Sequence, residues 1–233
     1  MKGLYLFINM AAVSIPFLAS FGPKIQFWHK WKSLFPAIAL TMLVFIPWDI
    51  LFTHRGIWDF NPSYLTGIYL FNLPLEEWLF FITIPYACIF TFEVIKFFLK
   101  PDYRLSWTKY ISVFLASFLL VSGFRNIDLT YTSVTFIATG LFILAHQFIL
   151  KSQYLSLFYI TYLFCLIPFL LVNGVLTGTF LENPVVSYNN EFNLGYRIFT
   201  IPVEDVFYGM LLILLNLTFY DYFSRLFNRK KSA

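Results

Sequence analysis

Two copies of an acidic motif are the residues of this sequence most suited to chemistry. The segments PLEEWLFF and PVEDVFYG share the pattern P-x-E-[ED] at an offset of 128 residues, and their acids are Glu76, Glu77, Glu204 and Asp205. A carboxyl group removed from water stays protonated and can donate a proton, whereas a carboxylate that accepts hydrogen bonds stays ionised and can accept one. The four acids are therefore candidates for acid–base catalysis.

Helix capping is a simpler explanation for a single copy of this motif. Proline suits the first position of a helix, and acids in the first turn interact favourably with the helix dipole. Capping does not explain why flanking residues recur at the same offset, Asn61 with Asn189 and Gly67 with Gly195. Neighbouring helical residues point about 100° apart, so we expect one acid of each pair to face a substrate. The other acid then holds its neighbour or binds a loop.

Other polar and aromatic residues near the acids are candidates for supporting a substrate. Asp49 ends the second apolar run, on the side of the membrane where we expect the acidic motifs. Asn61 and Asn189 lie in long loops, 53–73 and 177–201, of a length typical of lids, although asparagine is also a natural turn residue. Aromatic faces stabilise carbocations, and the aromatic residues beside the motifs are Trp78, Phe80, Phe207 and Tyr208.

Signatures of other chemistry are missing from the sequence. It contains no glycine-rich dinucleotide fingerprint, P-loop, zinc or haem spacing, or G-x-S-x-G motif. We therefore predict no cofactor and no metal. Cys88 and Cys165 lie in apolar runs and are interpreted as small buried hydrophobic residues, without a disulfide.

Three further polar residues have structural interpretations. Glu93 lies three residues before Lys96, and Asp221 lies four residues before Arg225, which are spacings of ion pairs on a helix near the membrane interface. His146 is interpreted as a hydrogen-bonded histidine of a helix bundle, since no second histidine sits at metal-ligand spacing.

The composition identifies the elements that must position these residues as membrane helices. Of 233 residues, 59% are hydrophobic and 12% charged, and the mean hydropathy is +0.72. Seven apolar runs approach the length needed to cross a hydrocarbon core of about 30 Å. They are Leu4–Phe21, Leu34–Phe52, Trp78–Leu99, Leu105–Gly123, Thr132–Leu150, Tyr154–Leu176 and Val206–Tyr220, the fourth being interrupted by Lys109.

The motif offset predicts an internal duplication. The same offset carries the first apolar run onto the fifth, although the match thins between the second and sixth runs. We predict an all-α integral membrane protein with two three-helix repeats, 1–100 and 129–233, joined by a fourth helix within 101–128. One extra crossing makes the repeats parallel, so both acidic motifs reach the same side of the membrane. Four carboxyl groups can then share one cavity.

The distribution of basic residues predicts the orientation. On a seven-helix path, twelve Lys and Arg residues lie on the side of the C-terminus and four on the other side. The positive-inside rule then predicts a protein of the cell (inner) membrane with its C-terminus in the cytoplasm and its N-terminus outside. The net charge of +4 is attributed to this topology and to anionic lipid, and we predict no nucleic-acid partner.

The duplicated motif resembles one known family. Two three-helix units, each with P-x-E-[ED] at the start of its third helix, resemble the membrane-integral lycopene cyclases: the heterodimeric bacterial type, the fused single-chain type and the cyclase portion of the fungal bifunctional enzymes. PLEEWLFF and PVEDVFYG match in both halves, and the resemblance covers nearly the whole chain. The second half departs from the first at Val203 and Asp205, so unequal roles are expected for the two halves.

The resemblance implies an isomerase that converts the linear end groups of lycopene to β-ionone rings in carotenoid biosynthesis, without a flavin. It assigns the chemistry to Glu76, Glu77, Glu204 and Asp205. Two other classes remain open: a small-molecule transporter, which would place its ionisable residues nearer the bilayer midplane, and a carotenoid-binding membrane protein without catalysis. The sequence leaves open whether one or both ends react, whether the ring is β or ε, which carboxyl is the acid, and the oligomeric state.

Overall fold

The computed structural model describes residues 1–99 and 106–229 of the chain. Within these residues it contains seven α-helices and a few very short strands. The helices are α1 (Leu4–Ala19), α2 (Trp31–His54), α3 (Leu75–Leu99), α4 (Thr108–Arg125), α5 (Thr130–Leu144), α6 (Leu155–Leu176) and α7 (Val203–Arg229). The predicted all-α class and seven helices are confirmed.

Five helical segments of the described residues are long and apolar enough to cross a membrane, which fits a multi-pass membrane protein. These segments are Phe27–His54, Leu75–Leu99, Thr130–Ile149, Leu155–Leu176 and Val203–Asn228.

The two remaining helices are weaker candidates for membrane spans. Helix α1 is apolar but has 16 residues, which at 1.5 Å per residue is about 24 Å. Helix α4 has 18 residues, and the lysine at position 109 lies in its first turn. The predicted start of the fourth span, Leu105, lies outside the described residues, as do four residues of the charge count, Lys100, Arg104, Lys230 and Lys231.

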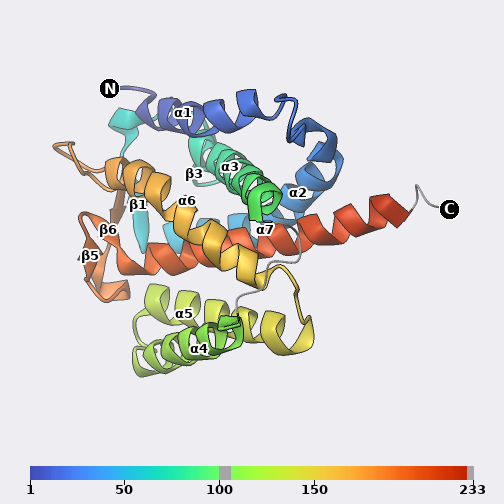
Figure 1. Ribbon diagram of the computed structural model, residues 1–233. Helices are drawn as coiled ribbons and strands as arrows, with labels where there is room; N and C mark the ends of the chain where they lie inside the picture. The colour runs from blue at the N-terminus through green and yellow to red at the C-terminus, as the bar shows by residue number, and fades with distance from the viewer. Residues whose placement is uncertain (100–105, 230–233) are drawn as a thin grey trace.

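The helices form the two predicted three-helix units, with α4 between them in the chain. Helix α1 packs on α3 in the first unit, and α5 packs on α7 in the second. Helix α4 packs along α5, so the joining helix lies against the second unit (Figure 1). Gly140 permits this close approach, because a Cβ atom there would lie 3.1 Å from the carbonyl oxygen of Ala116.

The contacts between the two units are unequal. Helix α2 of the first unit packs extensively along α7 of the second. The corresponding pair, α3 and α6, meets over a shorter stretch. The bundle is therefore more open between α3 and α6 than between α2 and α7, although the units are repeats.

Short strands connect the two units at the end where α3 and α7 begin. Strands β1 (Trp58–Phe60) and β4 (Val186–Tyr188) pair antiparallel across the units. Each unit also forms a small hairpin just before its third helix, β2 (Tyr69–Leu70) with β3 (Leu73–Pro74) and β5 (Arg197–Ile198) with β6 (Ile201–Pro202). The loops of the two repeats are therefore joined into one layer.

Polar side chains at the other end of the bundle are mostly paired as the sequence predicts. Arg225 and Asp221 form the expected ion pair at 2.9 Å. Glu93 is 4% exposed and binds Lys30 and the hydroxyl of Tyr220, while the nitrogen of Lys96 lies 3.9 Å away. Glu93 thus forms the ion pair that its spacing predicts, and Lys30 and Tyr220 of α7 are additional partners.

His146 has the predicted bundle role. It lies in a π-helical turn, Ala145–Ile149, that continues α5. Its Nδ1 lies 2.7 Å from the hydroxyl oxygen of Ser152, and its Nε2 lies 3.0 Å from that of Thr218. Both ring nitrogens therefore have partners within the bundle.

Candidate active site

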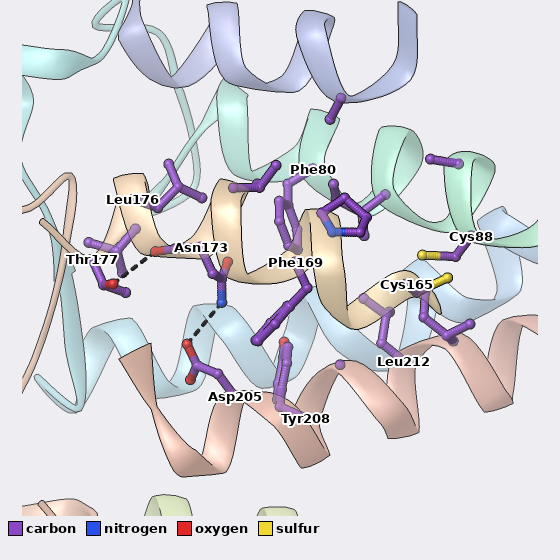
Figure 2. Close-up of a pocket in the computed structure, with 18 of the residues that line it drawn as sticks. Phe80, Cys88, Cys165, Phe169, Asn173, Leu176, Thr177, Asp205, Tyr208 and Leu212 are labelled. Carbon is purple, nitrogen blue, oxygen red and sulfur yellow. Dashed lines mark hydrogen bonds between the residues drawn. The ribbon is translucent and has the colours of Figure 1, made fainter. Parts of the chain in front are cut away.

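A cavity of about 370 Å³ lies between the two units. Residues of α1, α2, α3, α5, α6 and α7 line it, together with β1 and β4. Figure 2 shows lining residues of α3, α6 and α7. Three of its lining residues are buried acids, Asp49 from α2, Glu77 from α3 and Asp205 from α7. The parallel arrangement of the repeats thus brings acids from both motifs to one cavity.

The first acid of each motif has a different position. Glu76 and Glu204 are buried but do not line the cavity. The side-chain oxygen of Glu76 accepts a hydrogen bond from the backbone N–H of Thr66 at 2.6 Å, and that of Glu204 accepts one from the N–H of Leu194 at 2.8 Å. Both glutamates therefore bind the loop that precedes their own helix.

Asp205 accepts hydrogen bonds from three side chains. Its Oδ1 accepts from the hydroxyl of Tyr131 at 2.5 Å, and its Oδ2 accepts from the hydroxyl of Tyr188 at 2.9 Å. The amide of Asn173 also donates to Oδ2 at 3.1 Å (Figure 2). Burial and the adjacent Asp205 raise the pKa of Tyr188 well above its usual value, so this phenol stays a donor.

Glu77 and Asp49 form a carboxyl pair. The hydroxyl of Tyr5 donates to Oε2 of Glu77 at 2.6 Å, and the hydroxyl of Tyr208 donates to Oδ1 of Asp49 at 2.8 Å. The two carboxyl groups are neighbours in the cavity. Two neighbouring buried carboxylates repel each other, which favours the state in which one of them keeps a proton.

Aromatic rings form the wall around the acids. Trp58 meets Tyr131 edge to face at 5.3 Å between ring centroids, and Tyr131 stacks on Tyr188 at 5.9 Å. Phe80 and Tyr208, both predicted to support a substrate, line the same cavity. The cavity therefore combines carboxyl groups with several aromatic faces.

The other residues predicted to support a substrate lie elsewhere. Asn61 and Asn189 each accept a backbone hydrogen bond two residues ahead and cap the short turns Pro62–Tyr64 and Asn190–Phe192. Trp78 stacks on Phe71, and Phe207 packs against Phe136. None of the four predicted residues lines the cavity, namely Asn61, Asn189, Trp78 and Phe207.

The tyrosines and the amide that bind the acids were not predicted from the sequence. Tyr5 and Tyr131 play the same part in the two units but lie 126 residues apart, so the motif offset of 128 does not align them. Asn173 had a recognisable signal, because a polar residue inside an apolar membrane run often marks a functional position.

The mouth of the cavity lies between α1 and α6. Ala11 and Ile15 of α1 and Pro168 of α6 line the cavity and are also exposed on the outside of the bundle. Ala11 and Pro168 lie near the middle of their helices. The cavity thus opens on the side of the bundle between α1 and α6, and residues of β1 and β4 line another part of it.

Two free cysteines lie at the end of the cavity away from the acids. The thiols of Cys88 on α3 and Cys165 on α6 face one another (Figure 2). Among residues 1–99 and 106–229, no group of three or more His, Cys, Asp or Glu side chains is arranged to hold a metal ion.

Comparison with known proteins gives one match. The family model described as "Lycopene cyclase" matches residues 2–95 and 128–223. These two segments cover the two three-helix units except for the last residues of α3 and α7, and they leave α4 between them. No curated protein matches the chain, and no solved structure matches it.

Proposed function

Since the chain belongs to the lycopene cyclase family, we propose that it closes β-ionone rings on the linear end groups of lycopene. The reaction is an isomerisation. A proton adds to the terminal carbon–carbon double bond, the next double bond attacks the resulting carbocation, and loss of a ring proton restores a neutral product. No atoms or electrons are gained overall, so acid–base groups are sufficient for the chemistry.

The observation that supports this proposal is the meeting of acids from both repeats in one aromatic cavity. Glu77 and Asp205 come from equivalent positions of the two motifs, and Asp49 adds a third carboxyl group. The catalytic role falls to these three residues. Glu76 and Glu204 position the loops, because their side chains bind backbone N–H groups there.

The surroundings of the acids suit a carbocation. Trp58, Tyr131 and Tyr208 present aromatic faces, which stabilise positive charge when water is excluded. Strands β1 and β4 cover the cavity, so water has little access to a cation formed inside. A cation protected from water loses a proton instead of gaining a hydroxyl group.

The lateral mouth suits a long apolar substrate. Lycopene is about as long as the hydrocarbon core is thick, roughly 30 Å, while the cavity holds about 370 Å³. One end group enters and the rest of the polyene stays among lipid tails. A second ring requires release of the product and entry of the other end.

Expression in a lycopene-accumulating host tests the proposal. We expect pigment chromatography to show cyclic carotenes where the intact chain is expressed. Purified protein in liposomes, supplied with lycopene and no flavin or metal, should give the same product. Unchanged lycopene, with the protein verified in the membrane, would refute cyclase activity, and a strict requirement for reduced flavin would refute the cofactor-free mechanism.

A further inference from the structure

We infer that the Asp49–Glu77 pair is the proton donor and that Asp205 is the proton acceptor. This assignment rests on the proposed function and gives its two proton transfers to different parts of the cavity. It also assigns a direct catalytic role to Asp49, which belongs to α2 and lies outside both acidic motifs.

The hydrogen bonds of Asp205 favour its ionised form. Both of its oxygens accept hydrogen bonds, and Oδ2 accepts two. The amide nitrogen of Asn173 can only donate, so Oδ2 must act as an acceptor there. Three donors around one buried carboxylate stabilise its negative charge, and the group is ready to accept a proton.

The crowding of the pair favours one retained proton. Asp49 and Glu77 are buried neighbours in one cavity and repel each other as anions, so a state with a single negative charge is preferred. Tyr5 and Tyr208 each donate to one member, which supports a single negative charge shared by the two. Such a pair titrates as a unit and can release the proton that it holds.

The difference between the repeats agrees with this division. Phe60 occupies in β1 the position that Tyr188 occupies in β4, so Glu77 lacks the hydroxyl that Asp205 receives. Helix α6 contains no acid that could pair with Asp205 as Asp49 pairs with Glu77. Instead it supplies the amide of Asn173.

The proton balance closes over one turnover. The pair gives its proton to the terminal double bond, and Asp205 takes the proton that leaves the ring carbon. The pair is then doubly negative and Asp205 is neutral. Return of the proton from Asp205 to the pair within the shared cavity resets the site, and neither an oxidant nor a reductant is needed.

Three amide variants test the assignment in lycopene-accumulating cells. We expect Asp49→Asn and Glu77→Gln to lower conversion about 10²–10⁴-fold, the usual range for loss of a general acid. Asp205→Asn keeps the donor, so lycopene is still consumed, but the cation loses a proton from another carbon. Its products should then include rings with a displaced double bond, of the ε or exocyclic type.

A weaker variant and a matched control complete the test. Tyr188→Phe reproduces the first repeat at this position and should raise the share of displaced double bonds while conversion continues. Asp59→Asn changes an exposed acid of β1 outside the cavity and should behave as the unchanged chain.

Two results would overturn the assignment. One is an Asp205→Asn protein that accumulates in the membrane yet leaves lycopene untouched. The other is displaced double bonds in the Asp49→Asn or Glu77→Gln products. If the unchanged chain itself leaves lycopene untouched, the proposed function fails and not merely the division of roles.

Discussion

Adjacent acids in each motif take different positions because a helix turns about 100° per residue. The side chain of Asp205 reaches the cavity, whereas that of Glu204 reaches the backbone N–H of Leu194 and the hydroxyl of Thr132. In the first unit, Glu77 likewise lines the cavity, and Glu76 accepts a hydrogen bond from the backbone N–H of Thr66. The pattern P-x-E-[ED] therefore combines a loop anchor with an acid that faces the cavity.

Substitution of Glu204 separates anchoring from catalysis. Glu204→Gln keeps a side-chain oxygen that accepts from Leu194, so we expect near-normal lycopene conversion. Glu204→Ala leaves that buried N–H unpaired, which costs about 1–3 kcal/mol and should lower the unfolding temperature in detergent. Loss of conversion in a Glu204→Gln protein of normal stability would instead mean that Glu204 acts on the substrate.

The acids of the site could be predicted from the sequence, but their hydrogen-bond partners could not. Recurrence of the motif identified Glu77 and Asp205, since no capping requirement explains two copies in register. Tyr5 and Tyr131 were not predicted, because the first helices of the two units are shifted by two residues relative to the motif offset. Asn61 was expected near a substrate, yet its side chain is used by a local turn.

At the scale of helices, the unequal packing of the two units leaves room for the cavity between α3 and α6. Helices α2 and α7 are closely packed, whereas α3 and α6 leave room for the cavity, and α1 only partly covers it. Ala11 and Ala12 are small residues on the part of α1 that lines the cavity. Their size keeps the mouth open to lipid.

A bulky side chain at the mouth should block entry. We expect Ala11→Trp to lower lycopene conversion at least about tenfold, since an indole fills space that the end group must cross. Met10→Trp is the matched control, because Met10 is 44% exposed on the same turn of α1 but does not line the cavity. Equal conversion by both variants, at equal protein levels in the membrane, would place the entrance elsewhere.

Helices were more predictable than the elements that connect them. Long apolar runs located the strongest spans directly, and their boundaries moved by only a few residues, apart from the end of the seventh run. That run was predicted to end at Tyr220, whereas α7 continues to Arg229. Strands of two or three residues such as β2 and β3 leave no periodic pattern to detect. Pairing of β1 with β4 depends on contact between the two units, which local sequence does not encode.

At the scale of the molecule, duplication explains why one cavity contains unequal acids. Two units in the same orientation bring their third-helix acids together, and divergence at single positions such as Phe60 and Tyr188 then makes their surroundings different. Helix α4 joins the two units in the chain and packs along α5. It contributes no side chain to the cavity itself.

The orientation of the molecule decides which side of the membrane the acids face. The excess of basic residues on the side of the C-terminus predicts a cytoplasmic C-terminus and acids near the outer surface. We expect green fluorescent protein fused after Ala233 to fluoresce in bacterial cells, and alkaline phosphatase fused there to be inactive, because the first folds in the cytoplasm and the second outside it. Fusions of both reporters before Met1 should give the opposite pair of results, since seven crossings put the termini on opposite sides.

An active phosphatase at the C-terminus would invert the topology and place the acids near the cytoplasm. If both termini report the cytoplasm, the number of crossings is even. One of the two weaker spans, α1 or α4, then does not cross the bilayer.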